Sequence, residues 1–389
     1  AIIWINGGSN LDSKGKKGIN YMLSSLLTRG CRGFDNLALS DFIESRGAEL
    51  NHEVFEDGLM ISLKSLNDHF NKLLPLLDLM IDSPTLSENQ YKVVKKSTIN
   101  SIKKDKENPF SVSFEKWRNI VYCNHPYAFN PMGYEKDIQS IKYQDLLNEY
   151  EDFRIREKYL ISNNLNVKDD FFELYDLKVS KKESFSQVQI KNKESRFISA
   201  INVSNQTVLM LGNKTCSRDS SEYFPLKILE SYLSFGMSSL LFKLFREKNG
   251  ITYDVGVFYP IRKNEAPFLV YLSVSNKNAL LAFDILSELW KQLLFSLIPE
   301  EELRLAKEKL KSAFLINNQS IDEILQRKIQ LISYGIPYDS YEDYITRIEN
   351  VSTKDIQKII KKYFSNPFLS VNGQKQKCLE IQNKFYNEF

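Results

Sequence analysis

The chain has 389 residues, of which 42% are hydrophobic and 26% are charged, and its formal net charge is +3. That length allows two or three domains, and the nearly balanced charge gives no reason to expect a nucleic-acid partner. The longest apolar run, residues 73–81, contains Pro75 and Asp78, so we predict no membrane span. The N-terminus has no basic residues ahead of its short apolar run and is not a signal peptide, which favours a cytoplasmic over an exported protein.

The first elements in chain order are a predicted strand at residues 1–6 and a predicted helix at residues 18–30. The helix has one apolar stripe of leucines, and its other face carries Tyr21, Ser24 and Ser25. These three positions have the i, i+3, i+4 spacing of a helical metal site, but none is a good metal ligand. Without further information they also fit a plain polar helix face.

A second helix is predicted at residues 34–46, followed by strand-like alternation over residues 49–63. This strand carries Asn51, His52 and Glu53, which with Glu56 could suggest a metal site. Adjacent strand residues point to opposite faces, so a polar strand face is the better interpretation. Asn51 either faces a peptide substrate or belongs to a polar edge that deters aggregation.

Other potential metal ligands are sparse. The cysteines form no C-x-x-C pair and the histidines are scattered: Cys31, Cys123, Cys216, Cys378, His52, His69 and His125. This pattern excludes a disulfide framework and a zinc knuckle, so we expect free buried thiols. His125, which precedes Pro126, is expected to be a loop residue with a structural hydrogen bond.

Amphipathic helices are predicted at residues 68–82 and 87–106, and from there the two halves of the chain echo each other. Residues 76–102 and 289–314 each combine an apolar helix, a proline break, an acidic helix start and a long basic helix. Residues 138–150 likewise match residues 348–360, with Asp145 and Asp355 at the same place. Two copies of one domain explain an echo of this length.

The charged and polar stretch at residues 179–195 is predicted to link a domain at 1–178 to a second at 196–389. The second half begins with a strand at 207–211 and a helix from Tyr223. A helix from Gly236 to Gly250 and strands at 251–259 and 268–274 follow. Each half mixes strands with a majority of helices, so the predicted fold class is α+β.

Several of these stretches together resemble a known family. They are GGSNLDSKGKKGINYMLSSLLTRG, SRGAELNHEVFEDGLMISL, NHPYAFNPMGYEKDIQSI and, most specifically, FGMSSLLFKLFREKNGITYDVG. The chain resembles the pitrilysin and insulinase-type zinc metallopeptidases, in particular the short two-domain bacterial members related to mitochondrial processing peptidase. The resemblance implies two homologous domains in a clam-shell arrangement, each a mostly antiparallel sheet covered by helices. It also implies one or two strands ahead of residue 1.

The catalytic signature of that family is the inverted zinc motif H-x-x-E-H, followed some seventy residues later by a further glutamate. Carried over by position, Tyr21 and Ser25 replace the two histidines, and Ser24 replaces the glutamate base. The distal glutamate would fall near Ser97, beside the cations Lys95 and Lys96. The resemblance therefore implies no zinc in this chain and no peptidase activity by the chain alone.

The second domain of the family supplies an arginine and a tyrosine seven residues apart, and Arg246 and Tyr253 match them. Two such donors can stabilise the negative charge that develops on a substrate carbonyl during hydrolysis. From the residues alone, a surface arginine and a core tyrosine would be the plainer interpretation. Lys95 and Lys96 in the first domain are similarly expected to lie on the solvated side of a helix.

The leading hypothesis is a non-catalytic subunit of a heteromeric zinc peptidase. A homologous subunit would bring the zinc, and this chain would bring Arg246 and Tyr253, with a peptide as substrate. A structural or scaffold homologue without a role in proteolysis is the alternative, although a scaffold has no need of the arginine and tyrosine. An independent peptidase with another set of residues is disfavoured by the scattered histidines.

Overall fold

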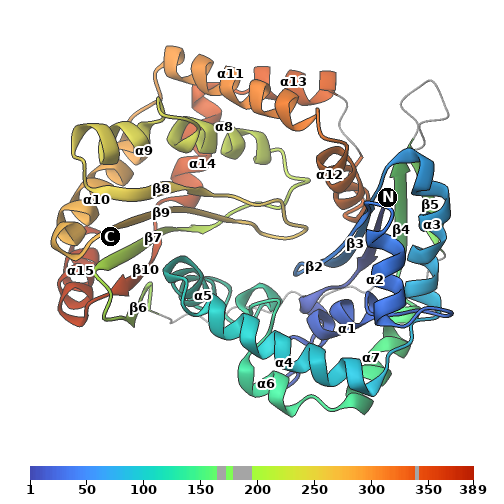
Figure 1. The fold of residues 1–389 in the computed structure, drawn as a ribbon. Helices are drawn as coiled ribbons and strands as arrows, with labels where there is room; N and C mark the ends of the chain where they lie inside the picture. Colours follow the sequence, from blue (N-terminus) through green and yellow to red (C-terminus); the bar gives the residue numbers. More distant parts are fainter. Residues whose placement is uncertain (164–171, 178–194, 338–340) are drawn as a thin grey trace. The chain divides into compact units, whose positions relative to one another are not determined.

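The computed structural model describes residues 1–163, 172–177, 195–337 and 341–389 (Figure 1). The chain forms two compact units. Unit 1 comprises Ala1–Asp105, Phe129–Val188 and Gln319–Tyr338, and unit 2 comprises Lys106–Ala128, Gln189–Asn318 and Asp339–Phe389. The predicted linker lies outside the described residues except for Ser195.

Unit 1 is built on a five-stranded sheet in the order β2-β3-β1-β4-β5, with antiparallel pairing throughout. The strands are β1 (Ile2–Asn6), β2 (Glu49–Val54), β3 (Gly58–Lys64), β4 (Lys158–Asn163) and β5 (Phe172–Leu177). The single strand predicted over residues 49–63 is in fact the β2–β3 hairpin, because Phe55, Glu56 and Asp57 connect two antiparallel strands. β2 therefore lies at one edge of the sheet.

One face of this sheet is covered by helices from the first half of the chain. They are α1 (Ile19–Leu27), α2 (Asn36–Glu44), α3 (Asn67–Asp82), α4 (Glu88–Asp105), α6 (Glu135–Ser140) and α7 (Tyr143–Arg154). Their apolar stripes form one core with Ile3, Ile5 and Ile61 of the strands. A short 3-10 helix, η1 (Ser9–Leu11), joins β1 to α1.

Unit 2 contains a second five-stranded sheet in the order β6-β10-β7-β9-β8, with one parallel pair, β6–β10 (Figure 1). Its strands are β6 (Phe197–Ile201), β7 (Gln206–Lys214), β8 (Thr252–Phe258), β9 (Pro267–Ser275) and β10 (Phe368–Gly373). Read in reverse, this order matches that of unit 1. The central strand is β1 in unit 1 and β7 in unit 2, and the edge hairpin is β2–β3 in unit 1 and β8–β9 in unit 2. The described strands thus confirm the α+β class and the duplication.

The helices of unit 2 repeat the sequence of elements seen in unit 1. They are α8 (Tyr223–Ser234), α9 (Leu240–Phe242) with the π-helix η3 (Lys243–Lys248), α10 (Ala279–Phe295), α11 (Glu300–Asn317), α13 (Tyr341–Glu349), α14 (Thr353–Tyr363) and α15 (Lys375–Glu388). Short 3-10 helices are η2 (Pro126–Ala128) and η4 (Asn276–Asn278). The core of the unit gathers on the side of the sheet that these helices cover.

Two helices pack in the unit built from the opposite half of the chain. α5 (Pro109–Tyr122) packs on β10, β7 and β6 of unit 2, where Trp117 Nε1 donates to Phe368 O at 3.3 Å. α12 (Ile321–Ser333) packs on β4 and β1 of unit 1, where Leu325 and Ile329 cover the buried Trp4. The units therefore differ from the sequence halves 1–178 and 196–389, because each sheet has a second apolar face that a helix of the other half covers.

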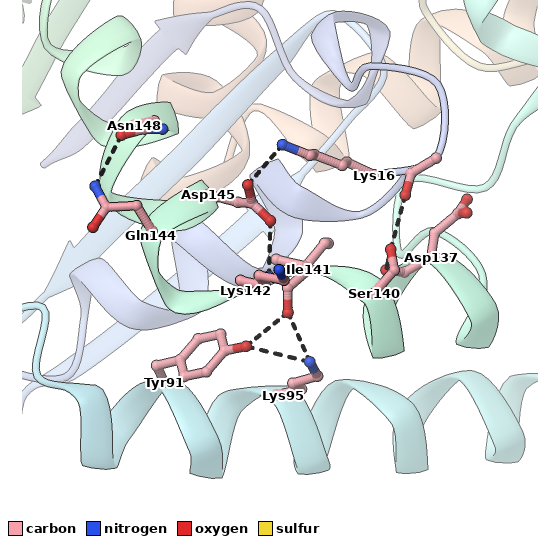
Figure 2. A network of polar contacts seen from close by, with 11 residues as sticks. Lys16, Tyr91, Lys95, Asp137, Ser140, Ile141, Lys142, Gln144, Asp145 and Asn148 are labelled. Carbon is pink, nitrogen blue, oxygen red and sulfur yellow. Dashed lines mark hydrogen bonds and ion pairs between the residues drawn. The ribbon is translucent and has the colours of Figure 1, made fainter.

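The matching positions Asp145 and Asp355 have the same structural role. Each is the third residue of its helix and accepts a hydrogen bond from the N-cap backbone, from Lys142 N at 2.9 Å and from Ser352 N at 2.8 Å. Asp145 also pairs with Lys16, at 2.8 Å (Figure 2). A carboxylate at this position satisfies a backbone donor that the first turn of a helix leaves free.

Lys95 does not lie where the sequence predicted, on the solvated side of its helix. Its ammonium does not lie free on the solvated side of α4: it donates to Ile141 O at 2.7 Å and to Gln139 O at 2.8 Å. Tyr91 OH donates to the same Ile141 carbonyl at 2.7 Å, as Figure 2 shows. The carbonyls at the end of α6 need donors, and the long lysine side chain reaches them from the neighbouring helix. Lys96 is exposed, as expected.

Candidate functional site

The loop before α1 fixes where that helix begins. Gly18 is its N-cap with φ +94°, and a Cβ there would lie 2.4 Å from Met132 O, so glycine is required. Asp12 accepts from Gly18 N at 2.6 Å and from the side chain of Asn20 at 2.8 Å. Burial raises the pKa of the Asp12 carboxyl to about 6, although these donors oppose the shift. α1 is therefore held at its start by a buried acid.

Tyr21, Ser24 and Ser25 lie on a packed face of α1. Ser24 and Ser25 are buried and Tyr21 is half-buried, so this is not a solvated polar face. The Ser24 hydroxyl has no hydrogen-bond partner among the described residues. Ser97 is exposed on α4, whose buried face instead carries Val94 and Thr98. The four positions carried over from the zinc motif thus hold three hydroxyls and a phenol.

This donor set does not fit a zinc ion. Serine hydroxyls are poor ligands at neutral pH, and burial raises the pKa of the Tyr21 phenol, which disfavours the phenolate that could bind a metal. In the described part of the chain, no group of three His, Cys, Asp or Glu side chains could hold a metal ion. None of the described helices is long and apolar enough to cross a bilayer.

The β2 edge strand alternates as its sequence predicts. Asn51 and Glu53 are exposed on the outer face, whereas His52 is half-buried on the inner face with Leu50 and Val54. This confirms that His52 and Glu53 point to opposite sides of the strand. Asn51 is placed where an added strand could meet it, since β2 pairs with β3 alone among the described strands.

Arg246 and Tyr253 lie in unit 2, and both side chains are exposed. Arg246 is on the π-helix η3, and its guanidinium carbon lies 5.3 Å from the Phe242 ring centre. Tyr253 is 64% exposed, at an irregularity of the edge strand β8 between Thr252 and Asp254. The alternative of a core tyrosine is therefore wrong. The described residues give neither side chain a hydrogen bond or an ion pair.

Local contacts explain why this segment presents both residues to solvent. Phe245 is fully buried and anchors η3, and its carbonyl accepts from Ile251 N at 3.0 Å. Gly250, with φ +59°, makes the reversal between them possible. The anchor faces inward, so Arg246 on the next position of the helix faces outward. A π-helical turn of this kind is common at functional sites.

His125 has the structural hydrogen bond that the sequence predicts, because its Nδ1 accepts from Tyr127 N at 3.1 Å. Sequence reasoning missed a buried ion pair on α8, between Lys227 Nζ and Glu230 Oε2 at 2.5 Å. The i, i+3 spacing of a lysine and a glutamate was visible. The burial of the pair could not be predicted, because Tyr259 and Tyr344, which help to enclose it, lie far along the chain.

Comparisons with known proteins place this fold in a family. The model of the insulinase domain, peptidase family M16, matches residues 1–133, and the model of the peptidase M16 inactive domain matches residues 161–310. The chain thus belongs to the M16 (insulinase) peptidase family and has its two-domain bacterial form. This confirms the family that the sequence motifs indicated.

Individual relatives match over nearly the whole chain. The "Uncharacterized zinc protease YmxG" of Bacillus subtilis is 20% identical over 94% of this chain and 90% of its own length. The "Non-peptidase homolog YmxG" of Helicobacter pylori is 21% identical over 91% of this chain and 84% of its own length. Relatives at this distance therefore carry names of both kinds.

Two solved structures share the fold. A peptidase M16 inactive domain from Pseudomonas fluorescens has a TM-score of 0.81 and 19% identity, over 96% of this chain and 92% of its own. A protease from Helicobacter pylori has a TM-score of 0.82 and 18% identity, with the same coverage. At these identities the likeness concerns the fold alone.

Proposed function

We propose that this chain is the non-catalytic subunit of a heteromeric zinc metallopeptidase. A homologous subunit with an intact zinc motif performs the hydrolysis, and this chain supplies Arg246 and Tyr253 to the bound peptide. One observation carries the proposal: these two side chains are exposed and unpaired among the described residues, while α1 offers no set of metal ligands.

The chemistry of the two side chains suits that role. An arginine guanidinium offers five N–H donors and is always charged, and a tyrosine phenol offers one O–H donor. Donors aimed at a carbonyl oxygen stabilise the charge that develops there when the carbonyl is attacked. Exposed donors that no neighbour occupies remain available to a ligand. Neither residue is required by the core, which Phe245 supplies locally.

The other elements of the proposal concern the peptide. An extended peptide adds as a strand to a sheet edge of the zinc-bearing subunit, since edge strands offer free backbone donors and acceptors. On this chain, Asn51 is the candidate second contact, because it is exposed on the edge strand β2. The non-peptidase name of the Helicobacter pylori relative supports the absence of hydrolysis by a chain of this kind alone.

The test combines the purified chain with a homologue of the same genome that retains H-x-x-E-H. We expect peptide hydrolysis only in the mixture and no stoichiometric zinc in this chain alone. Arg246→Ala should lower kcat/KM of the mixture by about 10²–10³, the effect of removing one oxyanion donor, and Tyr253→Phe should lower it by a smaller factor. The matched controls Arg304→Ala and Tyr386→Phe alter an exposed arginine and an exposed tyrosine elsewhere in unit 2.

Size-exclusion chromatography of each mixture separates assembly from catalysis. A stable complex whose rate is unchanged by Arg246→Ala and Tyr253→Phe would contradict the proposal and favour the scaffold alternative. Turnover by the purified chain alone would also contradict it. Loss of activity with both controls intact, and with the complex still formed, would support the assigned roles.

A further inference from the structure

Unit 1 contains a cavity that neither the zinc-motif positions nor Arg246 and Tyr253 explain. It has a volume of about 470 Å³ and lies between the end of α1, helix α2 and the edge strand β2. That volume is in the range of small-molecule sites. All its lining residues come from residues 28–52, so the cavity belongs to one unit and needs no second subunit.

The cavity is lined by buried apolar side chains and by more exposed polar ones. Leu39, Ile43 and Ala48 are buried, whereas Arg29 and His52 are half-buried. Pockets of this kind bind a ligand by its apolar part and orient it by a few polar groups. The polar groups therefore identify the ligand.

Arg29 is the cation of the cavity. It forms no ion pair with any described residue, and its one recorded hydrogen bond goes to the neutral Gln90 side chain at 3.4 Å. A half-buried guanidinium without a carboxylate partner is poorly satisfied, since it has five donors in a fork that matches a carboxylate. The carboxylates Glu44 and Glu49 also line the cavity, but neither pairs with Arg29, so a ligand carboxylate can take that place.

His52 supplies an acceptor beside that cation. The Thr28 hydroxyl donates to Ser25 O at 3.2 Å and lies 3.4 Å from His52 Nδ1, an arrangement that fits a neutral His52 with its hydrogen on Nδ1. The neutral imidazole then has its lone pair on Nε2, which no described residue occupies. Burial, with the nearby Arg29 charge, lowers the pKa of His52 and keeps the ring neutral.

We propose that this cavity binds a carboxylate that carries an apolar side chain, as found at the C-terminus of a peptide or in a free amino acid. The carboxylate pairs with Arg29, the side chain packs on Leu39 and Ile43, and the nitrogen next to the α-carbon donates to His52 Nε2. The inference does not rest on the roles proposed for Arg246 and Tyr253, which lie in unit 2, although Asn51, the candidate peptide contact on β2, also lines the cavity.

The exposed carboxylates Glu44 and Glu49 at the rim distinguish the two sources of the ligand. A free amino acid has an ammonium group that these carboxylates attract. A peptide C-terminus has a neutral amide instead. Three probes separate the cases: N-acetyl-leucine has the carboxylate without the ammonium, leucinamide has the ammonium without the carboxylate, and leucine has both.

The experiment measures binding of each probe to the full chain by calorimetry and by the imidazole NMR signals, with that of His52 assigned from His52→Gln. We expect N-acetyl-leucine to bind and to shift the His52 signal, and Arg29→Gln to weaken binding by about tenfold or more. Arg32→Gln, which alters an exposed arginine outside the cavity, should have no effect. Tighter binding of leucine than of N-acetyl-leucine would assign a free amino acid, and the reverse a peptide C-terminus.

Ser40→Leu gives a second variant that narrows the cavity and leaves Arg29 intact. This variant should also weaken the binding of N-acetyl-leucine, while its circular dichroism spectrum should be that of a folded chain. Three results would overturn the proposal: leucinamide binding as tightly as N-acetyl-leucine, Arg29→Gln binding like Arg32→Gln, or no His52 shift at the solubility limit of the probes.

Discussion

Helices α1 and α8 occupy the same place in the two units, since each follows the central strand of its sheet and precedes the edge hairpin. On α1 the i, i+3, i+4 positions are Tyr21, Ser24 and Ser25. On α8 the same spacing is filled by Lys227, Glu230 and Ser231. The helix at this place in the fold thus carries a neutral set in one unit and an ion pair in the other.

The difference shows what burial demands of polar groups. On α8 the charges are enclosed together, and although burial disfavours the ammonium, the Glu230 carboxylate holds the pKa of Lys227 above its usual range. Ser231 Oγ donates to Ala306 O at 2.8 Å. On α1 no charge is present, and the buried Ser24 hydroxyl has no partner among the described residues. A neutral α1 therefore packs without requiring an ion to compensate it.

The largest expected effect comes from breaking the α8 pair. Lys227→Met leaves the Glu230 carboxylate buried without its partner, which should lower the free energy of unfolding by about 3–5 kcal/mol. Adding Glu230→Leu should restore most of that loss, because an apolar pair of similar volume needs no compensation. The control on α1 is Tyr21→Phe, which removes one half-buried hydroxyl. Urea unfolding measures all four proteins, and equal losses for Lys227→Met and Tyr21→Phe would refute the contrast.

The starts of the two helices should respond to pH in opposite directions. Asp12 beside α1 has its pKa raised by burial from 3.8 to about 6, so its stabilising contribution is full below pH 4 and is lost as pH rises through 6. Glu222, the N-cap of α8, is different: burial opposes ionisation, but Lys362 at 2.7 Å lowers its pKa below 4.5. The contribution of Glu222 is present above 4.5 and is lost as pH falls.

The measurement compares the free energy of unfolding of wild type and Asp12→Asn between pH 3 and 7. The difference between them should change by about 3 kcal/mol, with wild type losing relative stability as pH rises. For Glu222→Gln the change should have the other sign and occur below pH 4.5. NMR of the Asp12 carboxyl should show a titration midpoint near pH 6. A midpoint near pH 4 would contradict the predicted pH dependence of stability.

The duplication could be predicted from the sequence because it rests on local signals. Asp145 and Asp355 are capping residues, and a capping residue is recognised from its own few neighbours. The alternation of β2 is local in the same way. By contrast, α5 and α12 show an apolar stripe in the sequence but not the sheet that it covers. Their placement is decided by contacts far along the chain.

The candidate sites divide in the same manner. The absence of zinc ligands on α1 follows from residue identity alone. The exposure of Tyr253 does not, because it depends on an irregularity in the pairing of β8 with β9. The Arg29 and His52 cavity needs three elements to converge, two of which are separated by a turn. A property set by the residue type at one position could be predicted from the sequence. A site formed where separate elements come together could not.

The smallest expected effect is also the most direct comparison of the two helices. Ser24→Ala removes a buried hydroxyl that has no partner among the described residues, so stability should stay the same or rise by up to about 1 kcal/mol. Ser231→Ala removes a buried hydroxyl that serves Ala306 O, so stability should fall by about 1–2 kcal/mol. The change in the free energy of unfolding caused by the same serine-to-alanine substitution, measured by urea unfolding, should thus differ in sign between the units. A comparable loss at both positions would mean that Ser24 has a partner in solution, and α1 would then be as dependent on its polar groups as α8.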